Sequence, residues 1–255
     1  MSAKDLLVKP ISAQDANHFV RALHYSGKVV PNSQLHLGVY WNDRLHGVMQ
    51  FGPPLKKKNN INLISGTAWN GFIELNRLAF DEQLPRNSES RAISVAMRLL
   101  KKHYPHIEWV LSFADGTQCG DGTIYRASGF VLTDIRHSKS LRRNPETGEV
   151  MHAMQAHHKM IDVEFRGWDV LPGFQLRYIY FINKAARQRL TVPIIPFSKI
   201  EEMGIGMYKG VKRSKQAMAG TTGTAAGQHR PGRSKLEASN GRTTTTTDST
   251  QANTG

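Results

Sequence analysis

The segment that decides the fold lies in the middle of the chain, where FIELNRLAF at residues 72–80 and IEWVLSFA at residues 107–114 flank a helical stretch. The first run is strand-like, and the second is a nearly unbroken apolar run of the kind that is buried on both faces of a sheet. Between the two runs, apolar residues recur at helical spacing, at Ile93, Ala96, Met97 and Leu100. A strand, a helix and a strand within about forty residues form a βαβ unit, so we expect two parallel strands joined by a right-handed crossover.

The flanking sequence adds further strands and helices. Ser12 and Asp15 have the spacing of a capping box, and apolar residues follow at helical period, which predicts a helix that ends near His24. The other predicted elements are a β-hairpin at residues 35–40 and 45–51, a short helix at 122–128 that Gly129 ends, and strands at 151–162 and 175–182. The sequence therefore predicts an α/β (α+β) fold with one sheet and helices on both of its faces.

Composition limits the classes of protein to which the chain can belong. It has 255 residues, a formal net charge of +14 and a single cysteine, and it shows neither a signal peptide nor a long apolar run. One cysteine excludes an internal disulfide and a cysteine-based zinc site, and the lack of about 18 consecutive apolar residues predicts a soluble, intracellular protein with no membrane segment. The positive charge predicts a polyanionic partner, either nucleic acid or anionic lipid.

The end of the chain differs in composition from the rest. From Ser214 onward the only large apolar residues are Met218 and Leu236. Such a stretch cannot bury enough apolar area to offset the entropy that is lost when it is ordered. We therefore expect one folded domain at residues 1–208 and a basic, disordered tail at residues 209–255, which either attracts phosphates or only keeps the chain in solution.

Two polar segments follow the predicted parallel strands, and ligands of open α/β sheets gather at this end of the strands. The first segment opens the central helix and suits an anionic ligand such as a phosphate, although N-capping by Asn87 or Ser88 is an equally good explanation. Its polar residues are Arg86, Asn87, Ser88, Ser90 and Arg91. In the second segment, a functional role is favoured for Ser112 and Asp115, whereas Tyr125 suits the core equally well.

Two motifs resemble the GCN5-related N-acetyltransferase (GNAT) fold. They are ELNRLAF at residues 74–80, followed by an arginine-led helix start, and IYRASGF at residues 124–130, which has a Tyr-x-x-x-Gly-Phe pattern. The chain is similar more narrowly, over residues 20 to 200, to the Mom family of phage DNA-modification proteins. That similarity rests on these motifs together with His24-Tyr25, residues 86–91, residues 112–116 and residues 177–182. The resemblance implies a GNAT-like mixed sheet with splayed central parallel strands and flanking helices.

The resemblance also implies a function. Proteins of the Mom family convert adenine in phage DNA to an N6-carbamoylmethyl form, which shields the DNA from restriction enzymes in the host cytoplasm. The active-site residues that this similarity implies are His24, Tyr25, Ser112, Asp115 and Tyr125. Acetyl-coenzyme A and iron have been associated with the family, so the resemblance makes both of them candidate cofactors.

The identity of the group donor is open at this point. GNAT acetyltransferases bind coenzyme A through a Gln/Arg-x-x-Gly-x-Gly/Ala loop, whereas residues 86–91 are RNSESR, with neither glycine and with an acid at Glu89. An acetyl group also lacks the added nitrogen of the carbamoylmethyl product, whereas a glycyl group contains every atom of it. The expected donor is therefore glycyl-tRNA or acetyl-coenzyme A, and tRNA becomes a possible partner beside double-stranded DNA.

Roles for the implied active-site residues follow from this chemistry. The adenine amine lies within the base stack, so the base must be extruded and held. Tyr25 is the first candidate to stack on it, ahead of Tyr40 and Trp69. Asp115 is predicted to accept a proton from the attacking amine, and His24 either to relay that proton or to protonate a leaving group. Ser112 and Tyr125 are predicted to donate hydrogen bonds to the developing oxyanion.

Several other residues carry weaker predictions. Phosphate contacts are expected from Lys56, Lys57, Lys58, Arg142 and Arg143, with a solvated charge cluster as the alternative. His152, His157 and His158 suggest a metal site, but adjacent histidines point to opposite faces of a strand, which favours surface histidines. Two other functions are compatible with the same sequence: an N-acyltransferase that acts on a protein or a small amine, and a non-catalytic DNA-binding protein.

Overall fold

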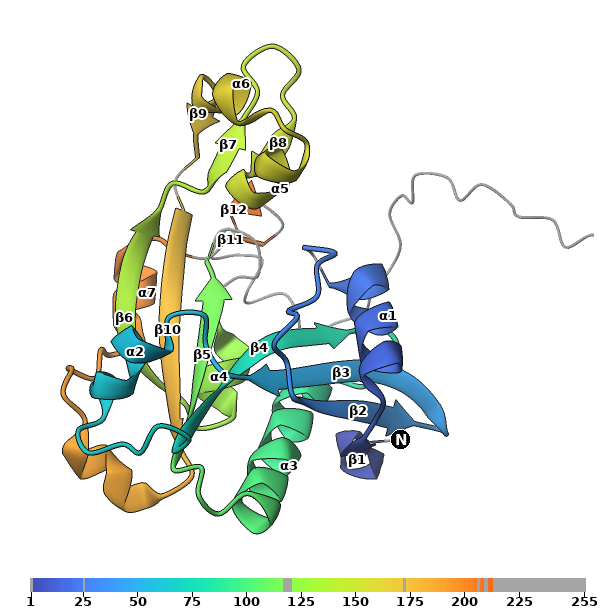
Figure 1. Cartoon of the computed structure of the whole chain (residues 1–255). Coiled ribbons are helices and arrows are strands. Elements are labelled where there is room, and N and C mark those ends of the chain that lie inside the picture. Colours follow the sequence, from blue (N-terminus) through green and yellow to red (C-terminus); the bar gives the residue numbers. More distant parts are fainter. Residues whose placement is uncertain are drawn as a thin grey trace, which may run out of the picture. The chain divides into compact units, whose positions relative to one another are not determined.

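The computed structural model describes residues 2–24, 26–116, 121–171, 173–205, 207–208 and 211–212 (Figure 1). Contacts divide the chain into one unit at Met1–Ser214 and a second at Lys215–Gly255. Nearly all of the predicted tail lies outside the described residues, and so do Tyr25 and Cys119, so the division at residue 208 stays a prediction. Among the helices that the structure describes, none is both long enough and apolar enough to cross a bilayer.

Helices and strands follow one another in a mixed order along the chain. The helices are η1 (Ala3–Asp5), α1 (Ala13–Leu23), α2 (Lys57–Asn60), η2 (Ile61–Leu63), α3 (Ser88–His103), α4 (Thr123–Ala127), α5 (Ala153–His158), α6 (Asp162–Arg166), η3 (Lys184–Arg189) and α7 (Ser198–Glu202). The strands are β1 (Leu7–Pro10), β2 (Leu35–Trp41), β3 (Arg44–Gly52), β4 (Phe72–Phe80), β5 (Trp109–Asp115), β6 (Val131–Ser138), β7 (Leu141–Arg143), β8 (Val150–His152), β9 (Asp169–Val170), β10 (Gly173–Phe181), β11 (Met207–Tyr208) and β12 (Val211–Lys212).

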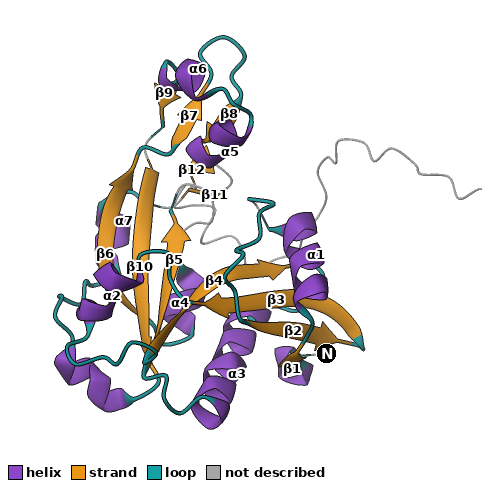
Figure 2. Cartoon of the chain, viewed as in Figure 1, coloured by secondary structure: helices purple, strands orange, loops and turns teal. Residues whose placement is uncertain are grey.

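Seven strands form the main sheet, in the order β1-β2-β3-β4-β5-β10-β6 (Figure 2). Strands β4 and β5 are parallel, and the other neighbouring pairs of this sheet are antiparallel. Helix α1 packs its buried residues in one apolar cluster with Val48, whereas helix α3 shares a cluster with Met49. Because successive strand residues point to opposite faces, the two helices cover opposite faces of the sheet. The predicted α/β fold with a GNAT-like mixed sheet is confirmed.

The parallel strands β4 and β5 stay together for only part of their length. They pair from Phe72 opposite Trp109 to Leu75 opposite Ser112. At that point β4 contains a bulge, because Gln50 and Phe51 of β3 lie opposite Arg77 and Leu75, which leaves Asn76 without a partner across the strands. Beyond the bulge β4 pairs only with β3, and β5 continues beside β10 as far as Asp115. The predicted splay is therefore present, and we call the place where the strands part the fork.

A small lobe is inserted between β6 and β10. It contains the three-stranded sheet β8-β7-β9 and helices α5 and α6, around a core of Met151, Ala156, Phe165 and Trp168. The prediction of one strand over residues 151–162 is wrong beyond His152, because the chain enters helix α5 there. The sequence Ala-Met-Gln-Ala at residues 153–156 consists of strong helix formers, and this local preference prevails.

Candidate active site at the fork

Ser112 closes the fork. Its side chain is fully buried, and its Oγ atom donates a hydrogen bond to the carbonyl oxygen of Leu75, at 3.1 Å. Leu75 and Ser112 form the last pair of residues before β4 and β5 separate. A serine hydroxyl has a single proton, so this bond occupies the proton that the predicted oxyanion role requires. The structure thus supports a positioning role for Ser112, and its role as an oxyanion donor stays a prediction.

His24 ends helix α1 and approaches the site from the other side of β4. Its Nδ1 atom accepts the backbone N–H of Ser26 at 3.2 Å and lies 2.8 Å from the Ser26 Oγ atom. Burial, assisted by the positive charge of Arg77, lowers the pKa of His24 from 6.5 to about 4. The imidazole is therefore neutral at pH 7, and because Nδ1 is an acceptor, the ring proton lies on Nε2. A neutral His24 with a protonated Nε2 can donate a hydrogen bond, and its role as a proton relay stays a prediction.

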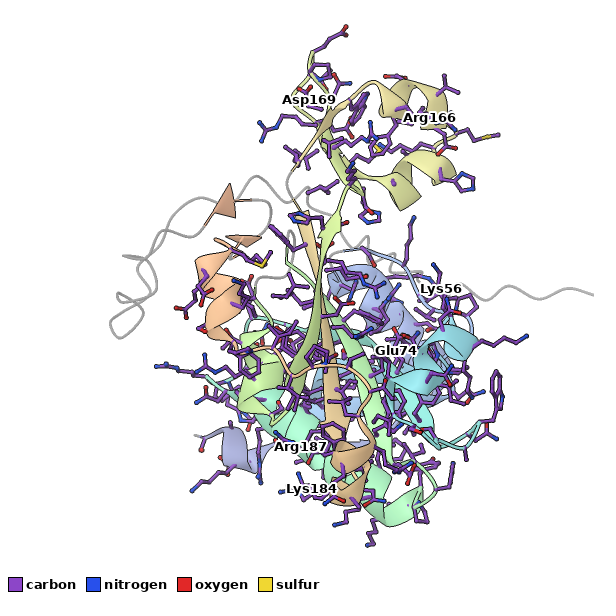
Figure 3. All side chains as sticks on the ribbon, turned by 90° about the vertical axis from the view of Figure 1, so that its left-hand side faces the viewer. Lys56, Glu74, Arg166, Asp169, Lys184 and Arg187 are labelled. Carbon is purple, nitrogen blue, oxygen red and sulfur yellow. The ribbon has the colours of Figure 1, made fainter. Side chains whose placement is uncertain are left out.

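Glu74 is the residue that the sequence did not single out. It lies on β4 at the fork, paired with Gly52 of β3 and Leu111 of β5, and burial raises the pKa of its carboxyl from 4.5 to about 7. Figure 3 shows Glu74 within the body of the domain. A carboxyl with a pKa near 7 exchanges its proton readily at physiological pH, which is what a general acid or base requires. The sequence signals were its place at the start of the ELNRLAF motif and the presence of an acid in an otherwise apolar strand.

Arg77 connects Glu74 with His24. Its positive charge lowers the pKa of both groups, although burial has the larger effect on each. The Nε atom of Arg77 donates to the Lys28 carbonyl oxygen at 2.7 Å, and an Nη atom donates to the Asn76 carbonyl oxygen at 2.6 Å. These bonds hold the guanidinium against the bulge of β4. The fork thus brings together a near-neutral carboxyl, a neutral imidazole and a fixed cation.

Asp115 ends β5 on the far side of the fork, opposite Gln175 of β10. The inserted lobe faces it. Burial of the His152 imidazole has the largest effect on its pKa and lowers it, the negative charge of Asp115 raises this pKa, and the positive charge of Lys28 lowers it. His152 is half-buried rather than fully exposed, so the expectation of a surface histidine is met only in part. His157 does fit that expectation, because its exposed ring lies 2.9 Å from the Asp162 carboxylate, whereas the side chain of His158 lies outside the described residues.

Tyr125 belongs to the core. It is buried, stacks on Tyr178 with ring centroids 5.0 Å apart, and contacts Phe130 edge-on at 5.3 Å. The Tyr178 hydroxyl donates to the Asp121 carbonyl oxygen at 2.6 Å, and burial raises the pKa of that phenol. The aromatic stack therefore anchors the C-terminal end of the polar loop that follows β5. A catalytic role for Tyr125 stays a prediction.

The start of helix α3 differs from ordinary N-capping. Asn87 occupies the N-cap position with a left-handed φ of 69° and makes no side-chain cap hydrogen bond. Ser88 and Ser90 donate their hydroxyl protons back to the carbonyl oxygens of Pro85, at 2.6 Å, and of Asn87, at 3.1 Å. The Nε atom of Arg91 is buried without a hydrogen-bond partner. The predicted alternative of capping by Asn87 or Ser88 is therefore wrong.

This arrangement fits an anionic group at α3, such as a phosphate of a donor. The helix presents its positive end with no side chain as a cap, and the Arg91 cation lies in the first turn. Arg86 is exposed there, whereas Ser88 is fully buried and supports the turn through its bond to Pro85. Binding of a donor by Arg86, Asn87, Ser88, Ser90 and Arg91 stays a prediction.

The predicted phosphate contacts differ in their surroundings. Lys56 and Lys58 are exposed, and so is Arg143. Arg142 donates through an Nη atom to the carbonyl oxygens of Arg166 and Trp168, so its guanidinium stabilises the inserted lobe. Lys57 is half-buried at the start of the short helix α2. The structure describes no cluster of three His, Cys, Asp or Glu residues that could hold a metal ion, so an iron site is not located.

Comparison with known proteins identifies the family. The chain matches the Mom protein family over residues 5–199. It is 35% identical over 208 residues to the methylcarbamoylase Mom of Escherichia phage Mu, an alignment that covers 75% of this chain and 82% of that protein. Solved structures with a similar fold include an acetyltransferase from Bacillus subtilis in complex with CoA and the ribosomal-protein-S18-alanine N-acetyltransferase from Escherichia coli. The TM-scores are 0.43 and 0.42, the identity is 11% for both, and the matches cover 69% of this chain and 98% and 94% of those chains. Because the family match spans most of its length, the chain belongs to the Mom protein family.

Proposed function

We propose that this protein is an enzyme that modifies adenine in phage DNA by transfer of a two-carbon group, to give N6-carbamoylmethyladenine. The name of the phage Mu relative, a methylcarbamoylase, supports a transfer of this group. The observation that carries the proposal is Glu74, a half-buried carboxyl with a pKa of about 7 at the fork. In this role the enzyme acts on DNA in the host cytoplasm, and the modification protects that DNA from restriction enzymes.

The product itself favours a glycyl donor. In the first step the N6 amine attacks the carbonyl carbon of an activated glycyl ester, the ester C–O bond breaks, and the released hydroxyl oxygen takes a proton. The resulting N6–C(=O)–CH2–NH2 group has a free amine, which attacks C6 of the purine. When the original C6–N bond then breaks, N6–CH2–C(=O)–NH2 remains, and no atom has to be added from another source. Glycyl-tRNA supplies such an ester, whereas acetyl-coenzyme A leaves the product nitrogen without an origin.

The residues at the fork have different chemical roles. Glu74 accepts the proton that leaves the attacking amine, since its pKa lies close to the pH of the cell. His24 donates a hydrogen bond from its Nε2–H group to the carbonyl oxygen on which negative charge develops. Asp115 remains the alternative proton acceptor, and its electrostatic contact with His152 gives it a second role in fixing the inserted lobe. Tyr25 is proposed to stack on the extruded base.

The donor is expected to bind through its phosphates at the first turn of α3. Helix α3 begins at Ser88 on the loop that leaves β4, and its uncapped N–H groups and Arg91 form the positive end. Both a tRNA and coenzyme A carry phosphate groups that fit this chemistry. The residues at the start of α3 therefore fit either donor. The preference for glycyl-tRNA rests on the nitrogen atom of the product.

The test supplies purified protein with adenine-containing DNA and either glycyl-tRNA or acetyl-coenzyme A, followed by mass spectrometry of the nucleosides. We expect N6-carbamoylmethyladenine with glycyl-tRNA alone. When the glycine is labelled with carbon-13 and nitrogen-15, both isotopes must appear in the modified nucleoside. Modification with acetyl-coenzyme A alone overturns the glycyl donor, and modification of a protein or a small amine in place of DNA overturns the proposed function.

A further inference from the structure

A second polar pocket lies at the start of β4, outside the residues assigned to the fork. Its volume is about 280 Å³, close to the lower end of the range of about 300–1,000 Å³ that small-molecule pockets occupy. It is lined by Gln34, Pro53, Lys57, Asn70, Phe72, Ile73, His106 and Ile107. An apolar floor with amide, imidazole and ammonium groups around it suits a ligand that has both a flat ring and an anionic group.

Lys57 is the cation of this pocket. Its Nζ atom lies 4.8 Å from the centroid of the Trp69 ring and 5.7 Å from that of Phe72, and it donates to the Asn70 Oδ1 atom at 3.3 Å. Among the ion pairs that the structure describes, none involves Lys57. Burial lowers the pKa of its ammonium, which shows that the charge is partly desolvated. A desolvated cation with no carboxylate partner is stabilised when an anion enters the pocket.

Trp69 supplies the second half of the site. Its side chain is 53% exposed although it is one of the largest apolar side chains in the chain, and it stands beside the ammonium of Lys57. An exposed aromatic ring next to a cation is the arrangement with which proteins bind single nucleotides, since the ring stacks on a base while the cation contacts the phosphate. The exposed Lys56 and Lys58 flank the same site and increase its attraction for a polyanion.

The pocket lies close to the fork along strand β4. Phe72 lines its floor, and Glu74 follows two positions later on the same face of β4. Two residues of a strand span about 7 Å. That separation is on the order of the distance between neighbouring nucleotides in an extended strand. A base held at Glu74 therefore leaves the next nucleotide of the same strand within reach of the pocket that Phe72 lines.

We propose that the pocket lined by Lys57, Asn70 and His106, together with the exposed Trp69 ring beside Lys57, binds the DNA nucleotide next to the modified adenine, with its phosphate on Lys57 and its base against Trp69. This inference rests on the proposed function, which identifies the bound polymer as DNA. The pocket adds a contact that holds the DNA strand while the adenine is extruded. The Asn70 and Gln34 amides and the His106 imidazole are available to the edge of that base.

The experiment measures the affinity of the full chain for a fluorescently labelled single-stranded DNA oligonucleotide, with no donor present, over a range of salt concentrations. Lys57→Gln is expected to weaken binding about tenfold and to reduce the slope of log affinity against log salt by about one. Trp69→Ala is expected to weaken binding about tenfold without a change in that slope. Trp69→Phe is expected to retain most of the affinity.

Lys184→Gln is the matched control. Lys184 is also an exposed lysine over an aromatic ring, 5.4 Å from the Tyr180 centroid, and Figure 3 shows it far from Lys56. This variant is expected to bind DNA within twofold of the unmodified protein. Intrinsic fluorescence gives a second measurement, since DNA must quench the signal of Trp69 and this quenching must be absent from Trp69→Phe.

The proposal is overturned if either Lys57→Gln or Trp69→Ala binds DNA within twofold of the unmodified protein, or if Lys184→Gln weakens binding equally. Because affinity is measured without group transfer, failure of the proposed chemistry leaves these outcomes unchanged. Conversely, loss of the pocket contact with intact modification of free deoxyadenosine separates strand binding from catalysis.

Discussion

The Oγ atom of Ser112 donates a hydrogen bond to the carbonyl oxygen of Leu75, across the last pair of residues before the two parallel strands separate. This single hydrogen bond, with 3.1 Å between the two oxygen atoms, fixes the point at which the fork begins. The residue that the family resemblance implied as catalytic thus has a defined structural task. Substitutions at the fork can therefore separate positioning roles from chemical ones.

Ser112→Ala is expected to lower the free energy of unfolding by about 1–2 kcal/mol, because the buried Leu75 carbonyl loses a hydrogen-bond partner. Urea denaturation measures this change. Activity should fall as well, since the fork loses its fixed geometry. A variant with unchanged stability and abolished activity would show that the hydroxyl acts on the substrate and not on β4.

Glu74→Gln is expected to reduce the rate of adenine modification at least a hundredfold. In the unmodified protein the rate should rise as the pH increases through about 7, since the carboxyl must lose its proton before it can accept another. Asp115→Asn is the matched comparison, an amide in place of a carboxylate on the opposite strand. A pH profile that keeps its step near 7 in Glu74→Gln and loses it in Asp115→Asn reverses the assignment of the proton acceptor.

The raised pKa of Glu74 also affects stability. Its folded value of about 7 exceeds the ordinary value of 4.5, so the folded state binds more protons, and the contribution of Glu74 to stability is lost as the pH rises from 4.5 through 7. Glu74→Gln removes this dependence. The midpoint of thermal unfolding should therefore be higher for the variant than for the unmodified protein at pH 8 and not at pH 4.

His24 is expected to stay neutral throughout the physiological range, with a pKa of about 4. An NMR titration should show no change in its ring signals above pH 6. Because the folded pKa lies below the ordinary value of 6.5, the unfolded state binds more protons, and stability is lost as the pH falls from 6.5 through 4. His24→Gln keeps a side-chain donor and removes this acid sensitivity, and a rate that still depends on a histidine titration near pH 6.5 contradicts the donor role.

Gly122→Ala is expected to destabilise the protein by about 2 kcal/mol or more. Gly122 has a φ of 70°, and an added Cβ atom would lie 2.5 Å from the Tyr178 hydroxyl oxygen. Gly148→Ala is the matched control, since Gly148 has a φ of 72° but an added Cβ atom there would meet no atom within 4 Å. Equal losses of stability in the two variants would assign the whole effect to backbone strain and none to Tyr178.

Asp115→Asn is expected to lower the pKa of His152 further, because the carboxylate now raises it. Lys28→Met should raise the same pKa, since the lysine cation lowers it. An NMR titration of the His152 ring in the two variants gives both directions. A His152 pKa that responds to neither change would show that the inserted lobe does not face the fork.

The sequence by itself determined the course of the chain through the sheet. Periodicity predicted the βαβ unit, the hairpin before it and the helix that Ser12 caps, because strands and helices impose different spacings on apolar residues. It also marked Ser112 and Asp115, since polar residues behind a buried strand are conspicuous. It failed at residues 153–158, where a strand was expected and local helix preference prevailed.

Tertiary structure alone decided the chemical state of the site. The pKa values of Glu74 and His24 depend on burial and on a guanidinium that the bulge of β4 holds near both, and neither burial nor a bulge is visible in the spacing of residues. In the same way only the fold placed His152 of the lobe near Asp115, and Lys57 beside Trp69. Periodicity records which face of an element is apolar, whereas desolvation and charge coupling arise from side chains that meet across different elements.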